Sequence, residues 1–167
     1  ATLVGDADMI AKVCEEEKLD ASVFHIVDVK EELKAISTAV DMINNKEGDI
    51  LMKGLCSTDK YMRAILKKEG GLLPPKAVLS HVAVLESPFY HKLMIISDMA
   101  VIPAPDLKQK EAITKYVVNT AKALQIEKPK VAFIAATEQM LAGMPACVDA
   151  AILAKMVDRG QIPGCVA

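Results

Sequence analysis

Aromatic side chains are scarce in this sequence: its 167 residues include three Tyr, three Phe and no Trp. Proteins that bind single-stranded nucleic acid stack the bases on aromatic rings, and proteins at a membrane interface are anchored by Trp and Tyr. The sequence therefore argues against both kinds of partner. We expect ligand specificity to come from polar side chains and backbone groups instead.

An excess of positive charge is also absent. Lys and Arg number 20 against 22 acidic residues, for a net charge of -2, and the basic residues form no tract that could follow a phosphate backbone. There is no apolar run long enough to span a bilayer and no charged-then-apolar signal sequence at the start. With 52% hydrophobic residues, the composition predicts a soluble, cytoplasmic globular protein that binds neither nucleic acid nor membrane.

Paired metal-binding cysteines are missing as well. The four cysteines form no C-x-x-C pair, which argues against a zinc knuckle or a redox dithiol, and a chain of this size needs no disulfide framework. They are Cys14, Cys56, Cys147 and Cys165. The histidines have no partner at ligand spacing, and His81 lies in an apolar run where we expect a core residue. No metal site is predicted.

What the sequence does contain is a regular alternation of short β-forming runs and segments with apolar residues at helical spacing. The expected strands are residues 1–5, 24–28, 50–52 and 131–136. The expected helices are a segment capped by Asp6, the segment from Leu33 to Ile43, and residues 57–68, 107–126 and 145–159, the last with Val148, Ala151, Ile152 and Met156 facing inward. The final residues, 161–167, resemble the start of another strand.

The alternation is interrupted once, where AVLSHVAVLE and KLMIIS are separated only by SPFYH. This connection is too short for a helical crossover, so the two runs are expected to form an antiparallel pair. The next helix starts with Asp106 as N-cap and Gln109 three residues later, the pattern of a capping box. Together these patterns predict an α/β fold with a mixed, mostly parallel sheet sandwiched by helices.

The stretch ILMKGLCSTDKYMR suggests an anion site. If a strand ends before Lys53 and a helix begins near Ser57 or Thr58, then Lys53 and Gly54 lie at the carboxyl edge of the sheet, where open α/β folds bind ligands. The first amides of the helix and the two hydroxyls can donate to an anion, Lys53 adds a charge, and Gly54 permits close backbone approach. Arg63 in the second turn could add a bidentate fork.

A plainer interpretation of the same stretch is equally compatible with the sequence. Ser57 can be an ordinary N-cap, Asp59 can complement the helix dipole, and Lys53 and Arg63 can be solvated. The stretch is neither the G-x-x-x-x-G-K-[ST] loop nor the G-x-G-x-x-G fingerprint, so neither ATP nor NAD is supported.

Two carboxylates follow expected strands and are candidates for chemistry. Asp98 ends the strand KLMIIS, where it could orient a donor or accept a proton as a catalytic residue, or could simply be a strand-end turn residue. Glu138 follows the expected strand at 131–136, where it could contact substrate or be a solvated loop charge.

Four segments in order carry a family resemblance: DILMKGLCSTDKYMRAILKKEGGL, LSHVAVLESPFYHKLMIISDMAVIPAPDLKQKEAI, PKVAFIAATE and MPACVDAAILAKMVDRGQI. Together they resemble the phosphate acetyl/butyryltransferase family, with most likeness to its phosphate butyryltransferase branch. The most specific element is the strand-end SD followed by PAPD and a helix. The resemblance covers nearly the whole chain.

The resemblance implies transfer of a short-chain acyl group, butyryl or branched-chain, between CoA and inorganic phosphate by direct attack in a ternary complex. It implies acyl-CoA, phosphate and acyl phosphate as ligands, CoA as a substrate with no other cofactor, no metal, and a homo-oligomer. The implied fold is two-lobed, like isocitrate and isopropylmalate dehydrogenases, with a cleft between the lobes. Arg63 matches the arginine after the family's Ser/Thr-rich turn, which implies a contact with phosphate or the CoA pyrophosphate.

The family's usual length exceeds this chain at both ends. Residues 1–167 are therefore expected to be the central portion of the α/β domain, with lobe boundaries near 55–75 and 135–150, and the family's residues for thiol deprotonation and oxyanion stabilisation fall beyond Ala167. The main alternative is a non-catalytic acyl-CoA-sensing domain similar to the one fused to malic enzymes. A metal-dependent decarboxylating dehydrogenase is a weaker alternative, because no cluster of metal-coordinating acids or nicotinamide fingerprint is present.

Overall fold

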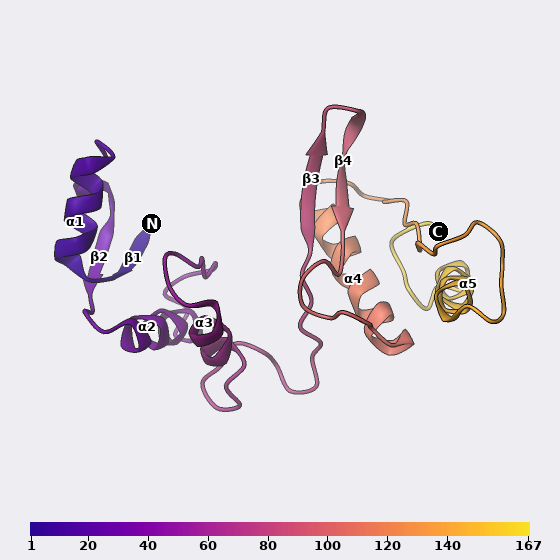
Figure 1. Ribbon diagram of the computed structural model, residues 1–167, viewed down its shortest axis with the longest axis horizontal. Helices are drawn as coiled ribbons and strands as arrows, with labels where there is room; N and C mark the ends of the chain where they lie inside the picture. The colour runs from indigo at the N-terminus through magenta and orange to yellow at the C-terminus, as the bar shows by residue number, and fades with distance from the viewer. The chain divides into compact units, whose positions relative to one another are not determined.

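The computed structural model describes residues 1–167 and divides into two compact units, Ala1–Ala77 and Val78–Ala167. Each unit is described by itself (Figure 1). The lobe boundaries expected near 55–75 and 135–150 stay predictions, because a division by compactness does not by itself define lobes around a cleft.

The first unit is a parallel strand pair with helices. Its elements are β1 (Thr2–Gly5), α1 (Ala7–Glu16), a 3-10 turn (Ala21–Val23), β2 (His25–Asp28), α2 (Glu32–Asn44) and α3 (Thr58–Ile65). The two strands pair from Thr2 with His25 to Gly5 with Asp28. Asp6 caps α1 by accepting from the amides of Asp8 and Met9, as its sequence position predicts. The first two expected strands and the helices that follow them are confirmed.

The strand expected at residues 50–52 is wrong. Residues 50–56 have no regular structure, and Ile50 and Met52 are 82% and 85% exposed. The parallel sheet contains only β1 and β2, so this run lacks the ladder of hydrogen bonds that defines a strand. The helix after it is shorter than expected, because the chain turns back beyond Leu66 and the amide of Leu72 bonds the carbonyl of Ile65.

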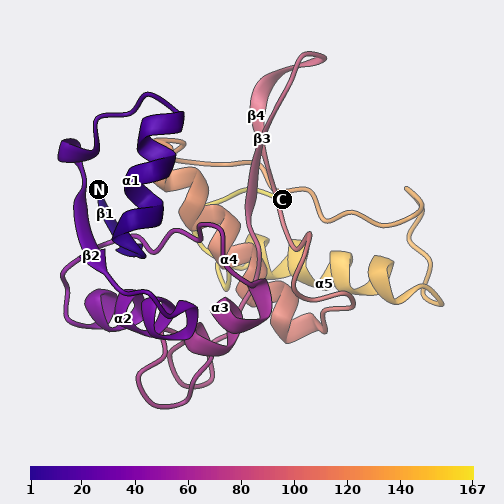
Figure 2. The same cartoon turned by 60° about the vertical axis from the view of Figure 1, so that its left-hand side comes forward.

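The second unit begins with the expected antiparallel hairpin. Its elements are β3 (Ala83–Ser87), β4 (Tyr90–Ile96), α4 (Leu107–Ala123) and α5 (Pro145–Asp158). Helix α4 packs on β4, and α5 packs on α4 (Figure 2). The predicted capping box is confirmed: Asp106 accepts from the amide of Gln109 at 2.8 Å, and the Gln109 side chain accepts from the amide of Asp106 at 2.9 Å. The helix ends at Ala123 instead of continuing to residue 126.

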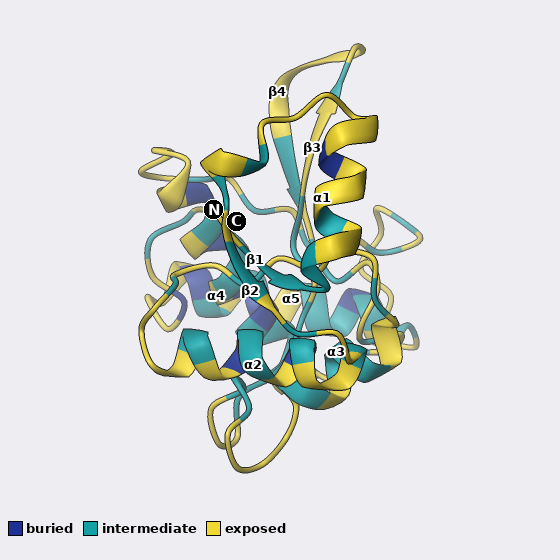
Figure 3. Ribbon diagram, turned by 90° about the vertical axis from the view of Figure 1, so that its left-hand side faces the viewer, coloured by how far each residue is buried: buried dark blue, intermediate teal, exposed yellow.

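The best-buried cluster of this unit lies around α5. Leu153 and Ile162 are each 1% exposed, and Val157 is 8% exposed. Partly buried residues pack against them: Leu107, Phe133, Met156 and Cys165. In Figure 3, buried residues are few, and exposed and intermediate residues outnumber them along the labelled helices.

The inward face expected for α5 is wrong at two positions. Ala151 and Ile152 are exposed, and the buried residues of the helix are Cys147, Leu153 and Val157. The helix is apolar nearly all round, so hydrophobic periodicity does not select one face. The choice is made by packing against the neighbouring segments.

The prediction of a single mixed, mostly parallel sheet is also wrong. The structure has two separate two-stranded sheets, one parallel and one antiparallel. Residues 131–136 are not a strand: Ile134 is 83% exposed, and this region contributes only one parallel bridge, between Lys130 and Val166. The strand expected at 161–167 is reduced to the same bridge. His81, expected in the core, is exposed, because the run that contains it is not a continuous strand.

Candidate functional site

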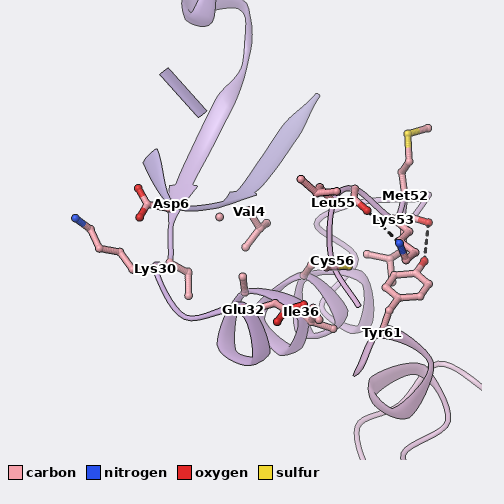
Figure 4. A pocket seen from close by; sticks show the side chains of 16 residues that line it. Val4, Asp6, Lys30, Glu32, Ile36, Met52, Lys53, Leu55, Cys56 and Tyr61 are labelled. Carbon is pink, nitrogen blue, oxygen red and sulfur yellow. Dashed lines mark hydrogen bonds between the residues drawn. The ribbon is translucent and has the colours of Figure 1, made fainter. Parts of the chain in front are cut away.

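A cavity of about 260 Å³ lies in the first unit, at the carboxyl ends of the parallel strands (Figure 4). This is the edge where α/β folds bind ligands. Its walls come from the end of β1, the segment leading into α2, α2 itself and the loop at 51–56. The lining residues are Val4, Gly5, Asp6, Val29, Lys30, Glu32, Ala35, Ile36, Ala39, Leu51, Met52, Lys53, Gly54, Leu55, Cys56 and Tyr61.

Two of the predicted ligand residues, Lys53 and Gly54, line this cavity side by side. The Lys53 ammonium donates to the carbonyl of Gly54 at 3.2 Å and forms no ion pair, whereas the other lysine of the cavity, Lys30, is paired with Asp8 at 3.0 Å. Lys53 is therefore the lysine of the cavity whose charge is not neutralised by a carboxylate. Apart from Gly54 and its two chain neighbours, no residue has an atom within 4 Å of the position that a Cβ at Gly54 would take, so the backbone there is open to a ligand.

The backbone amide just before α3 already donates to a carboxylate of this chain. Ser57 is the N-cap, as the plainer interpretation expects, but its side chain makes no capping bond. Its amide donates instead to Glu32 Oε1 at 2.8 Å, and Glu32 Oε2 forms an ion pair with Lys60. The bond from Lys60, followed by that from Ser57, lowers the pKa of the Glu32 carboxyl. Ser57 and Thr58 are exposed and do not line the cavity.

Arg63 does not line the cavity either. It pairs with Asp59 one turn earlier at 2.9 Å, and the two side chains are 79% and 66% exposed. An exposed pair of this kind contributes little to stability. The structure thus places Arg63 on a solvated helix face, and its contact with a substrate stays a prediction.

Glu32 and Tyr61 are cavity residues that sequence reasoning missed. The Tyr61 hydroxyl donates to the carbonyl of Leu51 at 3.4 Å. Burial raises the pKa of Tyr61, and nearby Cys56 raises it further, so the phenol is a neutral donor at physiological pH. No local signal marks either residue, because each acts on a segment 10 or more positions away.

Asp98, in the second unit, forms a turn at the end of β4. Its carboxylate accepts from the amides of Ala100 and Val101, each at 2.8 Å, and from the amide of His81 at 3.2 Å. Burial alone would raise its pKa, but hydrogen bonds from the amides of Val101, Ala100, His81 and Ile102 lower the pKa to about 2. Such a carboxylate is a weak proton acceptor at neutral pH.

Glu138 lies in different surroundings within the same unit. It is exposed on the wall of a cavity of about 700 Å³ between residues 131–140 and α5, and it makes no ion pair. Asp98 does not line that cavity. Lys53 and Gly54, which are adjacent in the sequence, therefore line one cavity, whereas Asp98 and Glu138 do not share the cavity beside α5.

Replacing Asp98 with Asn is expected to flatten the acid dependence of stability. A carboxyl with a lowered folded-state pKa stabilises the protein above its unfolded value, about 3.9, and that contribution is lost as the pH falls toward 2. Urea unfolding followed by circular dichroism should show wild type losing more stability than Asp98→Asn between these pH values. Parallel pH profiles for the two proteins would contradict the assigned bonds.

Across residues 1–167, no three His, Cys, Asp or Glu side chains come together as a metal site requires, and all four cysteines are free. None of the helices has the length and apolar character needed to cross a bilayer.

Comparison with known proteins identifies the family. The model of the family described as phosphate acetyl/butaryl transferase matches residues 1–167. This chain belongs to that phosphate acyltransferase family. Among relatives, it is 42% identical over 166 residues to phosphate butyryltransferase of Clostridium acetobutylicum and 35% identical over 162 residues to phosphate acetyltransferase of Rhizobium meliloti. These alignments cover 99% and 97% of the chain, but 55% and 51% of the relatives, so the chain spans about half their length.

The fold agrees with this family membership. The crystal structure of a branched-chain phosphotransacylase from Enterococcus faecalis V583 matches 99% of the chain with a TM-score of 0.77, at 24% sequence identity and over 66% of that protein. The expected α/β class is confirmed. The likeness to isocitrate and isopropylmalate dehydrogenases stays a prediction.

Proposed function

We propose that the protein to which this chain belongs is an enzyme that transfers a short-chain acyl group, butyryl or branched-chain, between CoA and inorganic phosphate. The observation that carries the proposal is the match of the family model to residues 1–167. The preference for butyryl rests on two relatives named phosphate butyryltransferase, at 42% and 40% identity. The family resemblance also supports a cytoplasmic homo-oligomer with a two-lobed fold.

In the proposed reaction, a phosphate oxygen attacks the thioester carbonyl, the carbon–sulfur bond breaks, and CoA leaves as a thiolate. Direct attack in a ternary complex needs two bound substrates and a preorganised cation for the phosphate. Lys53 can supply that cation, because it lines the cavity without a carboxylate partner. Gly54 leaves the adjoining backbone open.

The other predicted residues are assigned roles that fit their surroundings. Ser57, Thr58 and Arg63 are exposed beside the cavity and are proposed to contact the extended CoA molecule, whose pyrophosphate suits hydroxyl and guanidinium donors. Asp98 is proposed to orient the backbone after β4, since its low pKa disfavours proton transfer. Glu138 is proposed to contact substrate from its exposed loop.

The test is release of CoA from butyryl-CoA by the full-length protein, measured by mass spectrometry so that its own thiols do not interfere. We expect turnover that requires phosphate, and faster turnover with butyryl-CoA or isobutyryl-CoA than with acetyl-CoA. Each methylene is worth about 0.8 kcal/mol in an apolar pocket, so chain preference should be a few-fold per carbon. Binding of butyryl-CoA without any turnover would contradict the proposal and favour a sensing domain.

A further inference from the structure

The loop that carries Lys53, residues 50–56, is not part of a β-sheet. Residues 50–56 make no ladder hydrogen bonds, and residues Met52 and Leu55 are 85% and 110% exposed. Burial of apolar surface therefore contributes little to fixing this segment. Its position relative to the cavity depends on a few specific hydrogen bonds.

Three hydrogen bonds hold the loop, one at its start, one in its middle and one at its end. At the start, the Tyr61 hydroxyl donates to the carbonyl of Leu51 at 3.4 Å, which is long for a hydrogen bond of this type. In the middle, the amide of Cys56 donates to the carbonyl of Gly54 at 3.0 Å and closes a tight turn directly after Lys53. At the end, the amide of Ser57 donates to Glu32 at 2.8 Å.

The bond at the end of the loop is the stronger tether. Glu32 belongs to α2, which packs against α3, and its acceptor is a carboxylate rather than a neutral carbonyl. Hydrogen bonds with an ionised partner are shorter and about twice as strong as neutral ones. The second oxygen of Glu32 forms an ion pair with Lys60 of α3, so both carboxylate oxygens of this α2 residue bind groups at the start of α3. Figure 4 shows Glu32 on the helix beneath the loop, at the cavity wall.

We propose that Glu32 is a positioning residue, whose bond to the Ser57 amide holds the Gly54–Cys56 turn and thereby keeps Lys53 at the cavity. Glu32 does not itself bind phosphate, because both its oxygens are engaged and its charge has the same sign as the ligand. It acts through the backbone of the loop. The role of Lys53 rests on the proposed function, whereas the tether can be measured without any turnover.

Three variants of the full-length protein separate the tether from the ion pair. Glu32→Ala removes both interactions, Glu32→Gln keeps an oxygen that accepts from Ser57, and Lys60→Met removes only the ion pair. The first readout is hydrogen exchange at the amides of Cys56 and Ser57, followed by mass spectrometry. The second is the phosphate KM and the kcat for CoA release.

Glu32→Ala is expected to speed exchange at these amides and raise the phosphate KM, each about tenfold, as loss of a hydrogen bond to a charged group predicts. In the same assays, kcat should stay within about threefold, because Glu32 is proposed to act on phosphate binding through the loop backbone and not on the chemical step. Glu32→Gln and Lys60→Met should change each quantity less than about threefold.

Two results would overturn the proposal: unchanged exchange in Glu32→Ala, or losses in Lys60→Met as large as those in Glu32→Ala. If wild type shows no turnover, the proposed function fails, and hydrogen exchange still decides the role of Glu32. If Glu32→Ala does not fold, Ser57→Pro removes the same amide donor at a φ of -61° that suits proline, and faster exchange at Cys56 is again expected.

Discussion

Replacing Lys53 with Ala is expected to raise the phosphate KM of the full-length protein by about ten- to a hundredfold, since a hydrogen bond to a charged group contributes about 1.5–3 kcal/mol. The physical reason is that Lys53 is the cavity lysine without a carboxylate partner, so its charge is available to an anion. The measurement is the initial rate of CoA release at varied phosphate and saturating butyryl-CoA. Binding of butyryl-CoA itself should change much less.

Two further variants make this result specific. Lys53→Arg keeps the positive charge and should recover part of the affinity, although the planar guanidinium does not reproduce the compact ammonium. Lys12→Ala is the matched control, because Lys12 lies on α1 of the same unit, outside the cavity lining, with a side chain that is 67% exposed. A phosphate KM in Lys53→Ala equal to that of Lys12→Ala would remove Lys53 from the phosphate site.

Replacing Leu153 with Ala is expected to lower the free energy of unfolding by about 2–5 kcal/mol, because it removes buried methyl groups and leaves a cavity. Leu153 is 1% exposed and packs with Val157 and Ile162 in the best-buried cluster of the second unit. Guanidinium unfolding followed by circular dichroism measures the change. The denaturant dependence should stay close to that of wild type if the unfolded state is unaffected.

The neighbouring residue provides the control. Ile152 is on the same helix but is 39% exposed, so Ile152→Ala should cost less than about 1.5 kcal/mol, helped by the high helix propensity of alanine. Equal losses for the two variants would show that Ile152 is as buried as Leu153, contrary to the structure.

Local signals in the sequence predicted the elements whose physical cause is itself local. The cap at Asp6 and the capping box between Asp106 and Gln109 depend on backbone amides within three residues, so their pattern is visible in the sequence. The antiparallel pair followed from a connection too short for a crossover. These predictions agree with the structure.

The predictions that failed concern strands, which need a partner that local sequence does not contain. Residues 50–52 and 131–136 have the composition of buried strands, yet neither forms a ladder. A strand's backbone groups are satisfied only when another strand lies beside it. On α5, an apolar surface all round left the choice of buried face to neighbouring segments in the same way.

At the candidate site, local sequence was enough to predict the loop with Lys53 and Gly54, and it carried the family resemblance that the comparison confirms. The structure was needed to show that Glu32 binds the amide of Ser57 before α3 and that the amide of His81, 17 positions away, joins those of Ala100 and Val101 on Asp98. Residue type and spacing show which groups are available locally, whereas Glu32 lies 25 positions from Ser57 and His81 lies 17 positions from Asp98, so only folding brings these partners together.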